Sequence, residues 1–213
     1  MNNLSKYIQI IILLQAVRAT LHFLLFFTSS LYTKNVIEKD IDRWLDLTGN
    51  ETLIKQSKWR RLVWLLWKFP EYRNLFYYRI KKDGKLINRI LMEIAKFFFV
   101  PMNTLFISTP HIGEGFFSQH GFSTIIAAQH IGKNCWINQQ VTIGYADDGA
   151  TPTIGDNVHI TAGAKVFGNI TIGDNSIIGA NSVVFKNVPP NCTVVGVPGY
   201  IVKQDGQKVK IQL

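Results

Sequence analysis

The sequence predicts a mainly β protein whose second half is a parallel β-solenoid and whose first half is helical. The motif Ile-Gly-Asp-Asn occurs at Ile154–Asn157 and is repeated at Ile172–Asn175. Between Ile154 and Val184 an aliphatic residue stands at every sixth position. A coil with three faces of six residues each returns to its starting point at the interval that separates the two motifs, which a helix or an ordinary sheet does not do. The motif is therefore expected to stack on its own copy one coil later.

Charge also divides the chain into two halves. Residues 1–104 carry 17 Lys and Arg against 8 Asp and Glu, whereas residues 105–213 carry 6 of each. We therefore expect a helical domain over 1–104, the solenoid over 105–203 and a C-terminal tail over 204–213. A basic half can meet phosphates, nucleic acid or an anionic membrane. We interpret the basic clusters Lys58–Arg61 and Arg79–Lys82 as a solvated face, with peripheral contact at an anionic membrane surface as the alternative, and we expect no nucleic-acid partner.

The N-terminal stretch over 1–33 raises the question of a membrane segment. The apolar stretches Tyr7–Leu14 and Phe23–Phe27 are interrupted by Gln15, Arg18 and His22. No apolar run reaches the roughly 20 residues that a bilayer span needs, and no signal-peptide pattern is present. A helix packed on protein is the favoured interpretation. A helix lying in a membrane interface and a membrane span remain the alternatives.

Residues 35–100 are expected to form four helices. Asn35 followed by Glu38 resembles a capping box at the start of the first helix. Thr48-Gly49-Asn50 is expected to end that helix and to start a second one that runs to Trp67 and is broken by Pro70. The third is expected over 71–82 and the fourth over 86–99, and we interpret their aromatic stripes as packing core.

The solenoid is expected to begin near residue 106. Its inner stack is predicted to consist of Ile112, Ile125, Ile131, Ile137, Ile143, Ile154, Ile160, Val166, Ile172, Ile178 and Val184. Two intervals break the period of six, because neither the step from Ile143 to Ile154 nor that from Ile112 to Ile125 is a multiple of it. Solenoids carry function where loops leave the coil, so Tyr145–Pro152 and the stretch around His120 are candidate functional segments.

Cys135 and Cys192 are expected in strands and cannot make a disulfide framework. A reducing compartment, the cytoplasm, fits them best.

The segments "HIGEGFFSQHG", "NQQVTIG" and "TPTIGDNVHITAGAKVFGNITIGDNSIIGANSVVFKNVPPNCTVVGVP" resemble the hexapeptide-repeat acyltransferases. Within them they are similar to the serine O-acetyltransferase family and its saccharide-modifying relatives, over about residues 107–203. The resemblance implies a left-handed parallel β-helix that assembles as a homotrimer or a dimer of trimers. It also implies acetyl-CoA bound between neighbouring coils, a histidine base at the subunit boundary, and no metal.

The resemblance also assigns roles to residues of this chain. His120 matches the catalytic histidine, which follows an Ile-Gly-x-Gly rung. The positions implied to contact acetyl-CoA are Gly144, Tyr145, Ala162, Ala180, Lys186 and Pro198. The positions implied to meet the acceptor are Gln119, Asp147, Asp148 and Thr151, although for the two aspartates the favoured interpretation is that they keep their loop solvated.

The acceptor is where this chain departs from the serine acetyltransferase pattern. Gln119 stands where the family has an aspartate, and Ala150-Thr151 replace an Arg-His pair that helps to hold serine. Binding an ammonium and a carboxylate usually needs paired opposite charges. We therefore expect a neutral saccharide hydroxyl as the acceptor, in polysaccharide synthesis. Serine, as in cysteine biosynthesis, is the alternative.

The chemistry implied is transfer of an acetyl group from a thioester to an alcohol. A neutral imidazole can take the alcohol's proton at neutral pH and return it to the leaving sulfur, and a backbone N–H near Gly144 could stabilise the oxyanion. The group that fixes the tautomer of His120 is left open between Glu114 and a backbone carbonyl.

Two other interpretations of the solenoid stay open. One is a zinc site of the γ-type carbonic anhydrase kind, built from His111, His120 and His130. Their spacing of nine and ten positions does not repeat the closely spaced pair of those enzymes. The other is a non-catalytic scaffold. His22, His111, His130 and His159 are interpreted as surface or packing residues.

Overall fold

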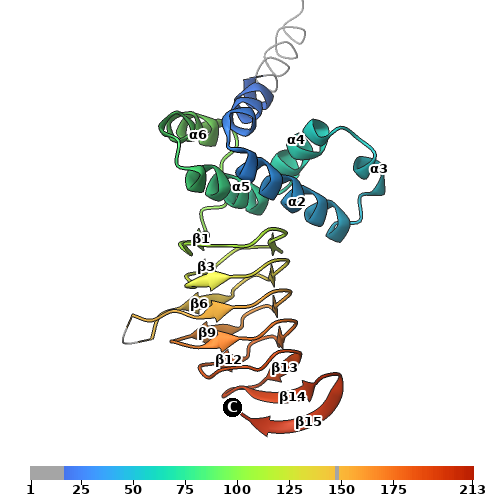
Figure 1. Ribbon diagram of the computed structural model, residues 1–213, viewed down its shortest axis with the longest axis vertical. Helices are drawn as coiled ribbons and strands as arrows, with labels where there is room; N and C mark the ends of the chain where they lie inside the picture. Colours follow the sequence, from blue (N-terminus) through green and yellow to red (C-terminus); the bar gives the residue numbers. More distant parts are fainter. Residues whose placement is uncertain (1–16, 147–148) are drawn as a thin grey trace, which may run out of the picture.

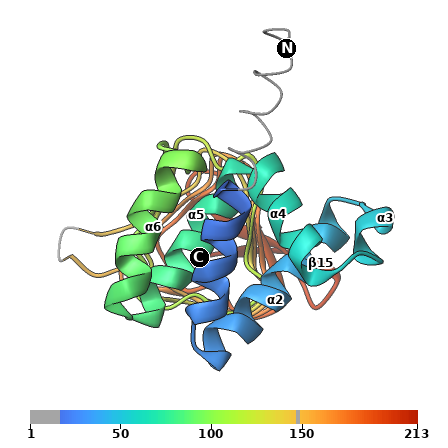
Figure 2. The ribbon, with the colours of Figure 1, turned by 90° about the horizontal axis from the view of Figure 1, so that it is seen from above.

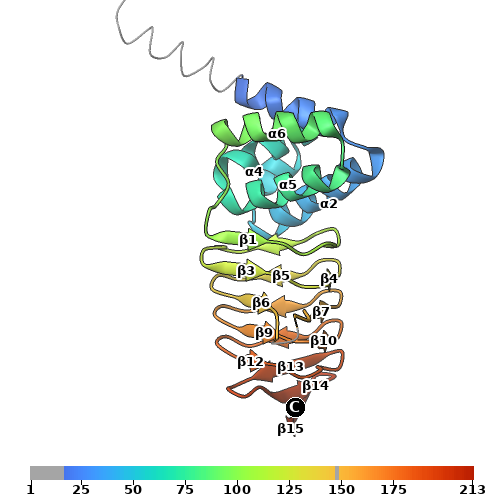
Figure 3. The ribbon, with the colours of Figure 1, turned by 90° about the vertical axis from the view of Figure 1, so that its left-hand side faces the viewer.

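The computed structural model describes residues 17–146 and 149–213 and consists of a helical region stacked on one end of a β-solenoid (Figures 1 and 3). Residues 17–28 are helical, and the helices that follow are α2 (Leu31–Leu47), α3 (Glu51–Ile54), α4 (Lys58–Lys68), α5 (Pro70–Asp83) and α6 (Leu86–Phe98). Seen from above, these helices cover the end of the solenoid (Figure 2).

The ends of the helices differ in part from the sequence expectation. The start of α2 is capped by Ser30, whose hydroxyl accepts a hydrogen bond from the Thr33 backbone N–H, so the expected cap at Asn35 is wrong. The second expected helix is two helices, because the chain breaks before Ser57, which caps α4. The third and fourth helices are confirmed, and Gly84 ends α5 in the left-handed conformation that glycine favours.

The solenoid winds through three parallel faces, which confirms the predicted parallel β-solenoid. Face A contains β1 (Leu105–Ile107), β3 (Thr124–Ile126), β6 (Thr142–Gly144), β9 (Lys165–Phe167) and β12 (Val183–Val184). Face B contains β4 (His130–Ile131), β7 (Thr153–Ile154) and β10 (Thr171–Ile172). Face C contains β2 (Phe117–Ser118), β5 (Trp136–Ile137), β8 (His159–Ile160), β11 (Ile177–Ile178) and β13 (Cys192–Val195). Left-handedness is implied by the resemblance alone.

Strands β14 (Tyr200–Gln204) and β15 (Gln207–Gln212) continue face C antiparallel to β13 and close the far end. The segment 204–213, expected as a tail, therefore contains a strand. The domain limits at 104 and 203 stay a prediction.

The predicted inner stack is present at ten of its eleven positions. Each of these is exposed by 3% or less: Ile112, Ile131, Ile137, Ile143, Ile154, Ile160, Val166, Ile172, Ile178 and Val184. Ile125 is the exception, because it is 46% exposed while Ile126 is fully buried in register with Ile143. Ile131 follows Ile126 by only five positions. A strict period of six therefore predicted Ile125 in the core, where the structure has Ile126.

The repeated Ile-Gly-Asp-Asn motif lies at the corner between faces B and C. The carboxylate of Asp174 accepts from the Asp156 backbone N–H at 2.7 Å, and the carboxylate of Asp156 accepts from the Lys133 N–H at 2.7 Å. The side-chain amide of Asn157 donates to that of Asn175 at 3.0 Å. Each copy therefore bonds to the next coil, which explains why the motif returns after one full turn.

A buried ion pair joins the helical region to the first coil. Arg79 of α5 and Asp40 of α2 are 6% and 1% exposed, with Nε 2.9 Å from the carboxylate. Arg79 also donates to the carbonyls of Ile112 and Gly113, and Asp40 accepts from the Gly115 N–H. The indole of Trp44 adds a hydrogen bond to the Phe116 carbonyl at 2.8 Å.

Candidate active site

His120 lies at the corner between faces C and A, in the first irregular rung. It is exposed, follows β2, and has a φ of 58°, a left-handed conformation that is uncommon outside glycine and asparagine. Its carbonyl accepts a hydrogen bond from the Phe122 N–H, which closes a tight turn. The irregular rung therefore presents an imidazole to solvent instead of burying it in the coil.

The side chain of Gln119, the residue before His120, is fixed by residues of the next coil. Its side-chain carbonyl accepts from the Asn138 amide at 2.9 Å, and the Asn138 carbonyl lies 2.8 Å from Nε2 of His159. The His159 ring stacks on Trp136 with ring centroids 4.6 Å apart. Asn138 and Trp136 carry no signal of their own in the sequence, and only their position one coil after Gln119 and Phe117 could have indicated them.

The other predicted site residues divide between two corners of the coil. Ala162 and Ala180 lie at the same corner as His120, one and two coils further along the solenoid than Asn138. Gly144, which is buried, Tyr145, which is 64% exposed, and Thr151 lie at the corner between faces A and B, where the chain leaves the coil (Figure 1). Asp147 and Asp148 lie outside the described residues.

Lys186 and Pro198 lie near the far end of the solenoid. They line a small cleft with Leu213, and Lys186 donates to the Leu213 carbonyl at 2.6 Å. A single chain thus does not bring the predicted cofactor positions together around His120.

Glu114 is not the partner of His120. Its carboxylate lies 2.7 Å from Nζ of Lys39 and 3.5 Å from Nζ of Lys133, at the corner between faces B and C. A different carboxylate reaches this corner: Glu71 of α5 packs against Gly121, where its Cγ would lie 3.0 Å from a Cβ at that position. Sequence reasoning missed Glu71 because it lies in the helical half, far from His120 along the chain.

His111 and His130 do not join His120. They lie along face B with their rings stacked at 4.8 Å between centroids, and the parts of the chain that the structure describes contain no group of three or more metal-binding side chains. His22 is buried, as expected of a packing residue. Both cysteines are free and buried, and burial raises the pKa of Cys135 to about 12.

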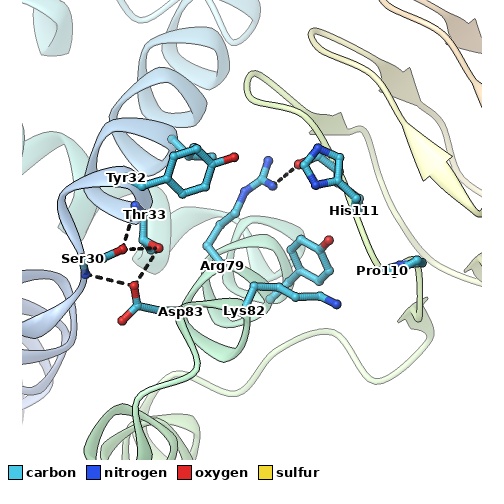
Figure 4. A pocket seen from close by; sticks show the side chains of 11 residues that line it. Ser30, Tyr32, Thr33, Arg79, Lys82, Asp83, Pro110 and His111 are labelled. Carbon is cyan, nitrogen blue, oxygen red and sulfur yellow. Dashed lines mark hydrogen bonds between the residues drawn. The ribbon is translucent and has the colours of Figure 1, made fainter.

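A second cleft of about 310 Å³ lies between the helical region and the first coil (Figure 4). Asp83 accepts hydrogen bonds from Ser30 and Thr33 at one side, while Arg79, Lys82 and His111 line the other. Arg79 is already paired with Asp40, so this cleft is a joint between the two halves and does not contain His120.

Comparison with known proteins identifies the repeats. Residues 151–186 match the family described as bacterial transferase hexapeptide (six repeats). A curated serine acetyltransferase of Staphylococcus xylosus is 44% identical over 133 residues, 61% of this chain and 60% of the relative. The chain therefore spans less than two thirds of that relative's length.

Solved structures share both the solenoid and the helical region. The serine acetyltransferase of Neisseria gonorrhoeae in complex with serine has a TM-score of 0.59 at 27% identity, covering 82% of this chain and 70% of that chain. The serine acetyltransferase of Brucella abortus in complex with coenzyme A has a TM-score of 0.56 at 28% identity, covering 81% and 68%.

These findings correct the expected acceptor. The relatives are named serine acetyltransferases, so the saccharide interpretation is wrong and the alternative, serine, fits better. Uncharged residues at Gln119 and Thr151 therefore do not exclude serine as the acceptor. Residues 151–186 thus match the hexapeptide transferase repeat, the fold is shared with solved serine acetyltransferases, and the named relatives are serine acetyltransferases.

Proposed function

We propose that this protein transfers the acetyl group of acetyl-CoA to the hydroxyl of serine, with His120 as the general base. The observation that carries the proposal is the solvent-facing imidazole at the corner between faces C and A, in a chain whose named relatives are serine acetyltransferases. Structures similar to this one have been solved with serine and with coenzyme A. These names support the choice of both substrates.

The reaction needs one proton to be moved twice. His120 takes the hydroxyl proton while the serine oxygen bonds to the thioester carbonyl carbon, and the C–S bond then breaks. The departing sulfur receives that proton from the imidazolium, so the products are O-acetylserine and CoA, and His120 is neutral again. No metal and no covalent enzyme intermediate are required.

The proposed site is completed by a second copy of the chain. Residues assigned to acetyl-CoA lie at two corners of successive coils and near the far end of the solenoid, and those at the corner between faces A and B lie away from the corner that carries His120. Phe106 and Ile125 are 65% and 46% exposed on face A, beside Phe122, which is 44% exposed. Such apolar exposure favours a neighbouring subunit, as in the trimer implied by the resemblance. Light scattering on the full chain measures this directly.

The experiment that tests the function is release of free CoA from acetyl-CoA with serine as the acceptor. We expect turnover with serine, and a loss of roughly 10²–10⁴-fold in kcat for His120→Ala because a general base contributes about that much. Binding of CoA should be nearly unchanged. His130→Ala, which changes a histidine of face B, is the matched control. Equal turnover by wild type and His120→Ala would contradict the proposed role.

Contact with a lipid surface is a second proposal, favoured by one face of the helical region. Leu86, Ile87, Ile90, Ile94 and Phe97 of α6 are 48–82% exposed. The adjoining helix over 17–28 is tied to α6 by a hydrogen bond from Thr28 to Asn88 and exposes Phe23 and Phe27. In the described part of the chain no helix is long and apolar enough to cross a bilayer. We propose a contact in which the exposed apolar face lies on the lipid surface, and flotation with anionic vesicles at low salt tests it: Phe97→Ser should weaken binding, and no binding by wild type would contradict the proposal.

A further inference from the structure

A buried carboxylate from the helical region lies against the corner that carries His120. Glu71 is the second residue of α5, is 8% exposed, and lies over Gly121, the residue after His120. A Cβ at Gly121 would sit 3.0 Å from the Glu71 Cγ and 3.0 Å from the Ser118 hydroxyl. Only glycine leaves room for both groups, so the chain brings them together at this turn.

Two polar atoms at this corner have no partner among the described residues. They are Oε2 of Glu71 and Oγ of Ser118. Ser118 pairs in register with Ile137, and so occupies an inner position that the following coils give to isoleucine or valine. A buried polar atom without a partner destabilises the folded protein. Two such atoms lie together beside the proposed base, which indicates that this arrangement serves function and not packing.

The charges around Glu71 couple it to His120. Burial raises the pKa of Glu71, while its own backbone N–H, a positive charge on His120 and the guanidinium of Arg73 oppose that rise. Arg73 is the other charged group that acts on this carboxylate, and it is held by the carbonyls of Leu66, Trp67 and Val100. The carboxylate therefore has one partner whose charge changes during the proposed reaction, and that partner is His120.

We infer that Glu71 is the positioning residue of His120, accepting through its unpartnered Oε2 a hydrogen bond from the ring nitrogen that does not take the substrate's proton. The inference rests on the proposed acetyl transfer. The hydroxyl proton passes to the other ring nitrogen and then to the leaving sulfur, while Glu71 stays ionised and offsets the imidazolium charge. The helical region thus contributes the acidic partner that the coil lacks.

The test replaces Glu71 by Gln, which keeps the shape and removes the charge. Glu114→Gln is the matched control, because it makes the same change in a carboxylate paired with Lys39 at another corner. We expect Glu71→Gln to lower kcat roughly 10-fold to 100-fold, as loss of a partner of a functional histidine does, with the KM for serine nearly unchanged. Glu71→Asp, which keeps the charge, should recover part of the rate. Glu114→Gln should behave as wild type.

Two readouts separate positioning from a structural role. Loss of the carboxylate removes a hydrogen-bond acceptor from the imidazole ring, so the ring nitrogen chemical shifts of His120, followed by NMR, should change in Glu71→Gln. Because burial raises the pKa of Glu71, its charge opposes folding increasingly as the pH rises. The thermal midpoint of Glu71→Gln at neutral pH should therefore equal or exceed that of wild type, whereas a structural role predicts a drop.

Three outcomes would overturn the inference: an unchanged kcat, unchanged ring nitrogen chemical shifts of His120, or a raised KM for serine at constant kcat, which would make Glu71 a ligand of the substrate ammonium. The NMR measurement needs no turnover. If wild type fails to acetylate serine but the His120 ring nitrogen shifts still change in Glu71→Gln, the proposed function fails and the contact stands.

Discussion

The two halves of this molecule are stabilised in different ways. In the solenoid each coil repeats the contacts of the previous one: the inner aliphatic side chains stack, and Asp156 and Asp174 bond to the coil before them. In the helical region the decisive contacts occur once. The Asp40–Arg79 pair and the His22–Tyr77 contact join residues 39 and 55 positions apart, with no periodic relation. A single substitution should therefore cost most where a contact is unique and least where it is repeated.

The largest effect is expected at the Asp40–Arg79 ion pair of the helical region, which also forms hydrogen bonds to the first coil. Arg79→Met leaves the buried carboxylate of Asp40 unpaired, so we expect the free energy of unfolding to fall by about 3–5 kcal/mol. Lys58→Met is the control, because its pair with Glu38 is 62% and 30% exposed and should contribute roughly 0–1 kcal/mol. Urea unfolding of both variants measures the difference. Similar losses of unfolding free energy in the two variants would contradict a larger contribution from the buried pair than from the exposed one.

The next effect concerns pH and the helical region alone. Nδ1 of His22 lies 2.8 Å from the Arg18 carbonyl and Nε2 lies 2.8 Å from the Tyr77 hydroxyl, and burial lowers the pKa of His22 to about 4. The unfolded chain binds the proton near the ordinary pKa of about 6.5. The stability that neutral His22 contributes is therefore full above about pH 6.5 and is lost as the pH falls towards 4, by up to about 3 kcal/mol.

The measurement is unfolding free energy at several pH values for wild type and His22→Gln. His111 and His159 also have lowered pKa values because they are partly buried, so their contribution is common to both proteins. The difference between the two curves isolates His22 and should shrink as the pH falls. A difference that stays constant from neutral pH down to the folded-state pKa would mean that His22 is protonated in the folded protein.

The solenoid was largely predictable because its contacts have a sequence period. The stacking of Ile154 on Ile172 follows from their spacing, as does the loop at Tyr145–Pro152. The period indicated the wrong residue only at Ile125, where one corner is a residue shorter. The helix starts at Ser30 and Ser57 were missed because several residues could cap a helix and the tertiary structure selects one of them. The contact of Glu71 with Gly121 joins residues far apart in the chain, so no local sequence pattern indicates it. The candidate site joins both halves, so the repeat pattern indicated His120 and missed its acidic neighbour.

A third prediction tests the close stacking of coils. A Cβ at Gly132 would lie 2.6 Å from the backbone C and O of Gly155 on the next coil, whereas at Gly144 the nearest atom would be 3.8 Å away. Gly132→Ala must push two coils apart, so we expect it to lower the free energy of unfolding by about 1–3 kcal/mol. Gly144→Ala should stay within about 0.5 kcal/mol. Equal effects in urea unfolding would contradict close stacking at this corner.

The smallest effect is expected where the solenoid repeats itself most. Asn175 has a φ of 58°, like Asn157 and Asn191, with which its side chain exchanges hydrogen bonds of 3.0 Å. Asn175→Ala loses these exposed bonds and places alanine in a left-handed conformation, so we expect a loss of about 1–2 kcal/mol. Asn175→Gly loses the same bonds but tolerates that φ, and should be about 1 kcal/mol more stable than the alanine variant.

Comparison of the Asn175 variants separates the backbone from the side-chain ladder. If alanine and glycine destabilise equally, the ladder of amides carries the corner and the left-handed backbone does not matter. If glycine restores nearly all stability, the corner is specified by backbone conformation, and asparagine is used because it tolerates that conformation while also bonding to its neighbours. Either way the loss should stay well below that of Arg79→Met, because Asn157 and Asn191 still hold the adjacent coils whereas no second ion pair replaces Asp40–Arg79 among the residues that the structure describes.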